Sequence, residues 1–411
     1  MGLTGNRRAI IQQELNHCNK CGFCLPVCPT YLLTGSELDS PRGRLAMAEA
    51  AIRGEVPWAH EVGDAFSRCL GCRACETACP SGVAYSRVYE AARESLYQSN
   101  PAHTLPWTVR PLLSWVKNRR RLRRLIRAGR VVRALLPRSL RQLLPERLSP
   151  STRHSLVATP TAAYFVGCIS DAVYGEANDA AIVLLESAGY TVQIPTTQQC
   201  CGALHMHAGD RPGAEALARA NLMAFSGELP VVNHAGGCGA FLKDYGHLLA
   251  GDGEWAERAA HFAERVRDLT ESLDDAPQTL FFKGQGQRVA LQNSCHLVNA
   301  QHIADRPKTW IRKVEGDQYV ELPGTDRCCG SAGIYNVVQP SLAQQILDDK
   351  MQEIQTAQPD VLLVNNPGCA LQMEHGSRAT GGPPVMYLSI YLKNRLTAAN
   401  PAEESAPAAR E

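Results

Sequence analysis

The sequence predicts a multidomain protein of the α plus α/β class, in which a helical N-terminal domain is followed by two duplicated parallel α/β repeats. Three observations lead to this prediction. Two cysteine runs of identical spacing lie in the first 80 residues, among segments of helical character. From residue 158 onward, short apolar segments alternate with helical ones, which favours parallel α/β units. The order of these segments and of the cysteines between them occurs twice.

The composition is that of a soluble globular protein with many cysteines. The chain has 411 residues, of which 45% are hydrophobic, 20% are charged and sixteen are cysteine. The opening MGLTGNRRAIIQQELN has no apolar signal-peptide core, so we expect a cytoplasmic protein, in which regularly spaced cysteines bind metal or carry redox chemistry. No stretch approaches 18 uninterrupted apolar residues, so no membrane-spanning helix is expected.

The two cysteine runs share the spacing C-x2-C-x2-C-x3-C-P, which binds a [4Fe–4S] cluster in bacterial ferredoxins. In ferredoxins with two clusters, the fourth cysteine of each run binds the cluster of the other run. The predicted ligands of one cluster are therefore Cys18, Cys21, Cys24 and Cys79. Those of the other cluster are Cys69, Cys72, Cys75 and Cys28. A pair of zinc knuckles is the alternative, which is disfavoured because zinc sites usually pair two C-x2-C elements.

Residues 1–105 are predicted to form this helical ferredoxin domain. Forty residues separate Cys28 from Cys69, far more than in a minimal bacterial ferredoxin. Ser40 and Pro41 are a typical N-cap and first helical residue, and RGRLAMAEAAIRG continues the helix. A second helix is expected after the second run, through SRVYEAARESLYQ.

Residues 106–153 form a strongly basic connector. Between Arg110 and Arg147 there are thirteen Lys or Arg residues and a single acidic residue, Glu146. Apolar residues recur at three- and four-residue steps, which predicts an amphipathic helix with an arginine-rich face, interrupted at Pro137 and Pro145. Such a face can lie on an anionic membrane, dock on an acidic partner subunit, or be simply solvated. No nucleic-acid partner is expected, because aromatic residues do not interleave the basic ones.

The two α/β repeats are predicted over residues 158–275 and 286–396, and each carries a C…CCG…C set. The cysteines of the first repeat are Cys168, Cys200, Cys201 and Cys238. Those of the second repeat are Cys295, Cys328, Cys329 and Cys369. They follow predicted strands, where open α/β sheets place their ligands. Four thiols suit an additional Fe–S centre or zinc, and buried structural thiols without metal are the alternative. Residues 397–411 are predicted to be a disordered tail.

No catalytic residue is expected in this chain. Gly284-Gln285-Gly286 is too short for a dinucleotide loop, and no flavin, nicotinamide, phosphate-loop or Ser/His/Asp pattern occurs. His205, His207 and His296 follow the repeat cysteines, and we interpret them as polar loop residues rather than ligands. The chain is thus predicted to transfer electrons without acting on an organic substrate.

Four segments carry a resemblance to a known family: CGFCLPVCPTYLLTGSELDSPRGRL, CLGCRACETACPSGV, GCGAFLKDYG and CCGSAGIYN. Together they resemble the iron–sulfur subunits of bacterial glycolate oxidase. The wider group includes subunits of anaerobic glycerol-3-phosphate dehydrogenase, lactate utilisation and heterodisulfide reductase. The resemblance extends from about residue 10 to 396 and is weakest in the basic connector.

This resemblance implies a subunit of a complex of three different proteins, glycolate dehydrogenase, an oxidoreductase that acts on a CH–OH group. A partner subunit with FAD would oxidise glycolate to glyoxylate, and this chain would pass the electrons toward quinone or another acceptor of the respiratory chain. The complex would lie peripherally on the cytoplasmic face of the inner membrane. The alternatives are the equivalent subunit for lactate, another 2-hydroxy acid or glycerol-3-phosphate, or a zinc-binding scaffold subunit.

The chain departs from the fullest pattern of this group in one respect. That pattern ends each repeat in C-x-x-C and so offers five cysteines per repeat. Here the final positions are Phe241 and Gln372. A centre with five thiolate ligands is therefore not expected in either repeat.

Overall fold

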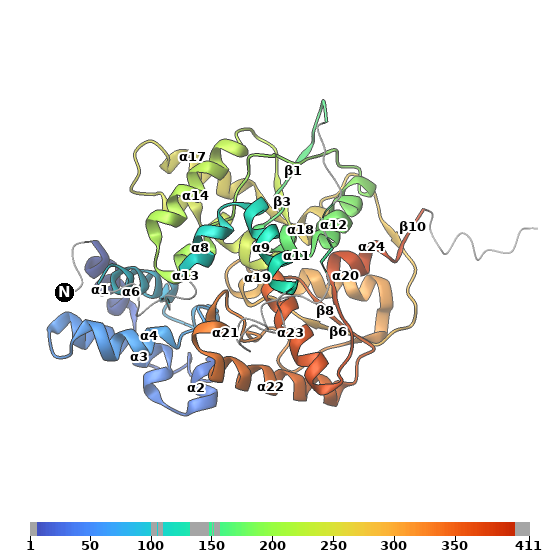
Figure 1. Cartoon of the computed structure of the whole chain (residues 1–411). Coiled ribbons are helices and arrows are strands. Elements are labelled where there is room, and N and C mark those ends of the chain that lie inside the picture. The colour runs from blue at the N-terminus through green and yellow to red at the C-terminus, as the bar shows by residue number, and fades with distance from the viewer. Residues whose placement is uncertain are drawn as a thin grey trace, which may run out of the picture.

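The computed structural model describes residues 6–99, 105, 110–131, 148–149, 151 and 157–398 (Figure 1). A helical N-terminal part is followed by two α/β units, each built on a four-stranded parallel sheet. This architecture confirms the predicted fold class. Within the described residues, no helix is both long and apolar enough to cross a bilayer.

The N-terminal part consists of short helices around one apolar core. Its elements are α1 (Asn6–His17), α2 (Pro29–Thr34), η1 (Glu37–Asp39), α3 (Pro41–Arg53), η2 (Trp58–Val62), α4 (Gly63–Ser67), α5 (Ala74–Thr77) and α6 (Tyr85–Ser99). Both predicted helices are present, as α3 and α6. The Ser40 hydroxyl caps α3 by accepting a hydrogen bond of 2.9 Å from the Gly43 amide. Phe66, Val88 and Leu96 are among the residues that fill the core.

The described part of the basic connector forms two helices where the apolar spacing predicted one. They are α8 (Arg110–Val116) and α9 (Arg119–Val131). Between them the Asn118 side chain accepts a hydrogen bond from the Arg121 amide, as an N-cap does, and so begins a new helix. Val116 and Leu122 are buried in the core of the first repeat. Pro137 and Pro145, the predicted interruptions, lie outside the described residues.

The first repeat begins with β1 (Ala162–Tyr164), which pairs in parallel with β2 (Val192–Gln193) and β3 (Val231–Asn233). The sheet order is β2-β1-β3-β4, with β4 (Val266–Asp268) at the edge. The helices of this repeat are α11 (Cys168–Val173), α12 (Gly175–Ser187), α13 (Ala203–Ala208), α14 (Arg211–Ala224), α15 (Gly236–Lys243), α16 (Tyr245–Leu248), α17 (Ala256–Arg265) and α18 (Leu269–Asp274).

The second repeat has the same strand order, β7-β6-β8-β9, again all parallel. Its strands are β6 (Val289–Gln292), β7 (Tyr319–Val320), β8 (Val361–Val364) and β9 (Val385–Tyr387). Its helices are α19 (Cys295–Asn299), α20 (Asp305–Glu315), η4 (Gly316–Gln318), α21 (Tyr335–Val338), α22 (Pro340–Ala357), α23 (Pro367–Thr380) and α24 (Leu388–Lys393). The shared order shows that the sequence duplication is a duplication of structure.

The two repeats share one apolar core. Ile182 and Leu185 of α12 pack in the same cluster as Tyr391 of α24, and the Ser389 hydroxyl donates to the Ala177 carbonyl over 2.9 Å. An antiparallel pair of β5 (Phe281–Phe282) with β10 (Leu396–Thr397) closes the second repeat. Thr397, the first residue of the predicted disordered tail, is instead paired in β10, and residues 399–411 of that predicted tail lie outside the described residues.

Candidate functional site

The two cysteine runs adopt the same backbone turn. The residue two positions after the first cysteine has a left-handed φ in both runs, 53° at Lys20 and 62° at Gly71. So does the residue after the second cysteine, with 89° at Gly22 and 63° at Arg73. A left-handed φ costs free energy where a side chain is present, so the turn holds Lys20 and Arg73 under strain. In each run, the first three cysteines line a common hollow.

The fourth cysteine of each run lies with the other run. Cys79 lines the hollow of the first run, and Cys28 lines that of the second. We call these hollows the first and second cysteine sites; Cys75 borders both. The first cysteine site contains Cys18, Cys21, Cys24 and Cys79. The second contains Cys28, Cys69, Cys72 and Cys75. This grouping is the one expected if the fourth cysteine of each run binds the cluster of the other run. The assignment of the cysteines as cluster ligands stays a prediction.

The two cysteine sites differ in exposure. Cys21 of the first site is exposed, and Phe23 beside it is 64% exposed. Cys28 of the second site is buried, and its hollow is bordered by Ala203 of the first repeat and His296 of the second. The first site therefore reaches solvent at Cys21 and the second is buried at Cys28, while the other six cysteines are partly exposed.

Backbone amides and one hydroxyl point at the sulfur atoms. The Gly71 amide lies 3.4 Å from Cys69 Sγ, and the Val83 amide lies 3.5 Å from Cys79 Sγ. The Tyr85 hydroxyl donates to Cys69 Sγ over 3.8 Å. Hydrogen bonds of this kind stabilise negative charge on sulfur, and they are among the factors that set the potential of an Fe–S cluster.

The chemistry of the thiols in the second site suits the binding of a metal cluster. Burial raises the pKa of the Cys72 and Cys75 thiols well above the usual value, and neighbouring cysteines raise it further. Metal binding requires the thiolate and releases its proton. Cys72 and Cys75 would therefore lose their protons when a cation binds, and together with Cys28 and Cys69 they supply the four sulfur donors that a [4Fe–4S] cluster needs.

The cysteines of each repeat come together in one group. In the first repeat, Cys168 Sγ lies 3.3 Å from Cys200 Sγ, and these two sulfurs are buried with Cys201. In the second, Cys329 Sγ lies 3.3 Å from Cys369 Sγ. Cys168 and Cys295 are the first residues of α11 and α19, just past the carboxyl ends of β1 and β6, as predicted.

Hydrogen bonds within these groups shift the pKa values of several thiols in opposite directions, and the bonds from Cys168 and Cys201 lower the pKa of the Cys200 thiol well below its usual value. The hydrogen bond to Cys200 and burial raise the pKa of the Cys168 thiol well above its usual value, and the hydrogen bond to Cys328 and burial do the same for Cys295. Across the described ranges, no three His, Cys, Asp or Glu side chains surround a point that one metal ion could occupy. The metal content of the repeats stays a prediction.

Other side chains occupy the position of the fifth cysteine in each repeat. Phe241 packs edge-on against Tyr245, with ring centroids 5.8 Å apart, and its ring borders Gly202 of the CCG turn. Gln372 accepts a hydrogen bond of 3.2 Å from Asn336. Phe241 thus makes a ring contact and Gln372 a side-chain hydrogen bond, which a cysteine at either position would not make in the same way.

The second cysteine run is hydrogen-bonded to the second repeat. The Asn299 amide donates to the Cys72 carbonyl over 3.1 Å, and its oxygen accepts from the Thr77 hydroxyl over 3.0 Å. Leu70 is buried in the same apolar cluster as Cys295 and Cys328, and Cys72 packs against this cluster. The second cysteine site and the cysteines of the second repeat are therefore neighbours.

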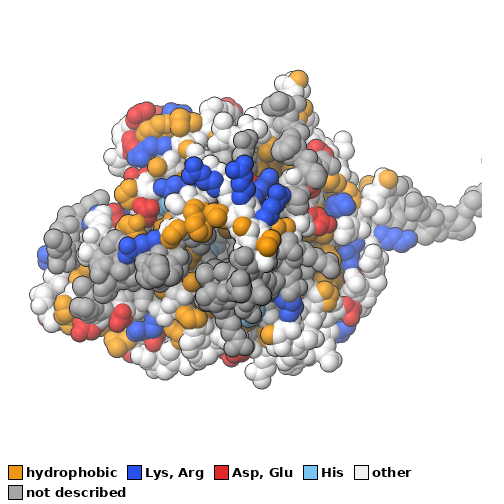
Figure 2. Space-filling view, in the orientation of Figure 1, with side chains coloured by type: hydrophobic (Ala, Val, Ile, Leu, Met, Phe, Trp, Pro, Cys, Tyr) orange, Lys and Arg blue, Asp and Glu red, His pale blue; other side chains and the backbone are white. Residues whose placement is uncertain are grey.

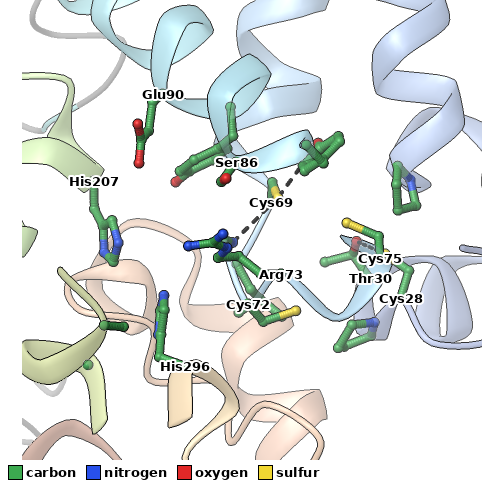
Figure 3. A pocket seen from close by; sticks show the side chains of 18 of the residues that line it. Cys28, Thr30, Cys69, Cys72, Arg73, Cys75, Ser86, Glu90, His207 and His296 are labelled. Carbon is green, nitrogen blue, oxygen red and sulfur yellow. Dashed lines mark hydrogen bonds between the residues drawn. The ribbon is translucent and has the colours of Figure 1, made fainter. Parts of the chain in front are cut away.

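The hollow of the second site continues into a polar lobe, which we define by Arg73, Glu90, His207 and His296 (Figure 3). Arg73 lies between the cysteines and the other three side chains. His207 of the first repeat stacks on His296 of the second, with ring centroids 5.7 Å apart. Burial lowers the pKa of His207 to about 4 and of His296 to about 3, and it raises the pKa of Glu90 to about 8. At neutral pH both histidines are therefore uncharged and Glu90 is mostly protonated.

The interpretation of three histidines as loop residues was wrong. His205 and His207 lie in α13, and His296 lies in α19. His205 is fully buried, with Nδ1 2.7 Å from Asp210 Oδ2 and Nε2 3.0 Å from the Leu113 carbonyl, so it joins α13 to the basic connector. Gly202 and Gly209, both in left-handed conformations, cap α13 at its two ends, and this glycine pair was the available sequence signal.

Two families match the chain, in three places. Residues 14–83 match the 4Fe-4S dicluster domain. Residues 162–243 and 289–374 each match the family described as "Cysteine-rich domain". These matches cover both cysteine runs and both repeats.

Relatives extend the likeness over nearly the whole chain. The chain is 37% identical over 401 residues to the probable glycolate oxidase iron-sulfur subunit of Bacillus subtilis strain 168, covering 90% of each protein. It is 32% identical to the glycolate oxidase iron-sulfur subunit of Escherichia coli K12, covering 91% of this chain and 94% of the relative. Lactate utilization protein A of Geobacillus kaustophilus is 32% identical, over 55% of this chain and 95% of its own length.

Proposed function

The chain belongs to the family of glycolate oxidase iron–sulfur subunits, and from this premise we propose that it transfers electrons from a flavin-bearing partner subunit that oxidises glycolate to glyoxylate. The observation that carries the proposal is the order of three cysteine groups. The first cysteine site, which reaches the surface at Cys21, adjoins the second site through Cys75, and the second site adjoins Cys295 and Cys328. A path from the surface into the protein is thus lined with thiols.

The proposed ligands follow this grouping. Cys18, Cys21, Cys24 and Cys79 would hold one [4Fe–4S] cluster. Cys28, Cys69, Cys72 and Cys75 would hold the other. A [4Fe–4S] cluster exchanges single electrons, whereas oxidation of glycolate to glyoxylate releases two, so the FAD of the partner subunit would deliver the pair in two steps. The exposed Cys21 and Phe23 mark the surface at which that flavin would approach.

The two repeats are the proposed route onward. The repeat cysteines would bind either an additional Fe–S centre or zinc. Only an Fe–S centre would extend the electron-transfer path, because zinc has no redox chemistry. We propose quinone as the final acceptor. Reduction of a quinone consumes protons as well as electrons, and the polar lobe places the protonated Glu90 in the hollow of the second site, which supports this acceptor.

The proposed domains are a ferredoxin domain at 1–105, a connector at 106–153, and repeats at 158–275 and 286–396; the tail, predicted from 397, would begin after β10, because Thr397 belongs to that strand. The family matches at 14–83, 162–243 and 289–374 lie inside three of these ranges. We further propose that the complex is peripheral on the cytoplasmic face of the inner membrane. Exposed arginines of α9 support that location (Figure 2).

The same electron-transfer role with another substrate is the second candidate. Lactate utilization proteins match over about half of the chain, which favours lactate as the rival; other 2-hydroxy acids and glycerol-3-phosphate are further alternatives. The geometry of the cysteine sites is common to all of them. The choice among substrates therefore depends on the partner subunit.

The test uses the native complex, purified anaerobically. Iron and sulfide analysis with EPR should find at least about eight iron atoms per chain, since two [4Fe–4S] clusters contain that number. Glycolate should then reduce the clusters in the complex, and lactate and glycerol-3-phosphate should do so more slowly. If the chain contains fewer iron atoms and gives no EPR signal of a reduced cluster, or if it contains zinc instead of iron, a scaffold role would replace the proposed electron transfer. Reduction by lactate alone would establish the second candidate.

A further inference from the structure

A buried arginine lies beside the second cysteine site, whereas none of the described residues that line the first site is a buried cation. Arg44 of α3 is 1% exposed and lines the hollow that contains Cys28 and Cys69. The cations that line the first site are the exposed Lys20, paired with Glu49 at 3.0 Å, and the partly exposed Arg42, paired with Glu37 at 2.7 Å. Solvent screens such surface pairs strongly, but it hardly screens a buried charge.

Arg44 is connected to the sulfur of Cys28 through one hydroxyl group. Its Nη2 donates to Thr30 Oγ1 over 3.1 Å, and that oxygen lies 3.3 Å from Cys28 Sγ. Its Nε donates to the Ala65 carbonyl over 2.7 Å, which fixes the guanidinium in place. The side chain is thus held against the second site by neutral partners.

The charges around the guanidinium do not cancel. Asp39 is the acidic group nearest to it, with Oδ1 3.8 Å from Arg44 Nη2, and the same carboxylate also pairs with Arg68. Two cations therefore share one anion. Burial works against the charge of Arg44, yet Cys69, Tyr85, Cys28 and Asp39 together raise its pKa, so it stays charged throughout the accessible pH range.

We propose that Arg44 raises the reduction potential of the cluster that the second cysteine site would hold, so that electrons arriving at the first site pass on to the second. This inference rests on the proposed function. A reduced cluster carries one more negative charge than an oxidised one, and a buried site disfavours added charge. Arg44 offsets that cost with a positive charge that water does not screen.

The experiment is a charge series read by EPR-monitored redox titration of the native complex. Arg44→Gln removes the positive charge and should lower the midpoint potential of the second cluster. Asp39→Asn removes the negative charge and should raise it. We expect each to change the electron-sharing equilibrium between the clusters by about tenfold or more, and tenfold is about 59 mV for a one-electron couple. Arg44→Lys keeps the charge and should shift the potential least.

Controls separate this effect from a loss of folding or of function. Arg42→Gln changes a partly exposed, paired cation at the first site and should leave the second midpoint unchanged. Cys21→Ser identifies which midpoint belongs to the first cluster. Each variant that is titrated must contain as much iron as the parent protein. If Arg44→Gln loses iron, the midpoint potentials of Asp39→Asn and Arg44→Lys still test the proposal. The proposal would be overturned if both clusters are present but the midpoint potential of the second cluster does not change. It would also be overturned if that potential moves in the same direction in Arg44→Gln and in Asp39→Asn. A complex without clusters would instead refute the proposed function.

Discussion

Asn299 of the second repeat donates its side-chain amide to the carbonyl of Cys72, 227 positions earlier in the chain, over 3.1 Å. The same side chain accepts from the Thr77 hydroxyl over 3.0 Å. One residue therefore bridges positions 72 and 77 of the second run, on either side of Cys75. This link ties the cysteine runs to the repeats.

Replacement of Asn299 should loosen this contact without unfolding either part. Asn299→Ala removes two hydrogen bonds and should cost about 1–3 kcal/mol locally. Hydrogen exchange at the amides of residues 72–78 should speed up accordingly. Gln344→Ala is the matched control, because it removes an exposed side-chain hydrogen bond within α22. If exchange at 72–78 is equally fast in both variants, the link does not hold the loop.

The cross-pairing of the cysteine runs predicts which substitutions act together. Cys28→Ser and Cys69→Ser should perturb the same EPR signal, because both residues line the second site. Cys24→Ser should perturb the other signal, although Cys24 and Cys28 belong to the same run. EPR of reduced, anaerobically purified complexes, with iron analysis, makes the comparison. A shared loss in Cys24→Ser and Cys28→Ser would show that each run binds its own cluster.

Much of the local structure follows from short-range signals in the sequence. Ser40 and Pro41 predict the start of α3, and the spacing of each cysteine run predicts a turn that the two runs share. The duplication of the CCG pattern predicts two α/β units, which the common strand order confirms. These features depend on residues that are close together in the chain.

Features that depend on tertiary packing were not predictable in the same way. His207 and His296 stack although 89 positions separate them, and nothing in their neighbourhoods predicts the contact. The break between α8 and α9 was missed because the apolar spacing continues past Asn118, whose capping bond ends one helix and begins another. Glu90 resembles a solvated residue in sequence, and only the fold shows that most of its side chain is covered.

Glu90, whose side chain is 16% exposed, predicts a pH dependence of stability. Burial, and after it the negative charge of Asp244, raises the pKa of Glu90 to about 8 in the folded protein. The positive charges of Arg87, Arg73 and Arg211 lower this pKa but are outweighed. In the unfolded chain the ordinary value of 4.5 applies. The folded state therefore binds more protons between these values, and stability falls as the pH rises through this window. The slope should reach at most about 1.4 kcal/mol per pH unit.

Glu90→Gln should remove this dependence. The melting temperature of the complex, measured anaerobically from pH 5 to 9, should fall less steeply in the variant than in the parent. Glu55→Gln is the control, since that side chain is 59% exposed and its loss should leave the slope unchanged. Equal slopes in Glu90→Gln and the parent would show that Glu90 is ionised in the folded protein.

The basic face of α9 predicts binding to anionic lipid. Arg121, Arg124 and Arg127 are exposed, and Val131 at the end of the helix is 87% exposed, so basic and apolar side chains lie on one helix (Figure 2). Basic residues at a membrane surface contribute about 1 kcal/mol each. Replacement of the three arginines by Gln should therefore weaken sedimentation with phosphatidylglycerol vesicles roughly 100-fold. High salt should weaken the parent in the same way.

A second set of basic residues controls for net charge. Arg306, Arg312 and Lys313 of α20 are also exposed, but each is paired with an acidic residue. Their replacement by Gln should leave vesicle binding nearly unchanged, because paired charges contribute little to the field at the surface. If the α9 variant still binds anionic vesicles as the parent does but loses its partner subunits, the face docks on protein. Equal binding to neutral phosphatidylcholine vesicles would contradict the electrostatic explanation, because such vesicles carry no net charge to attract arginine.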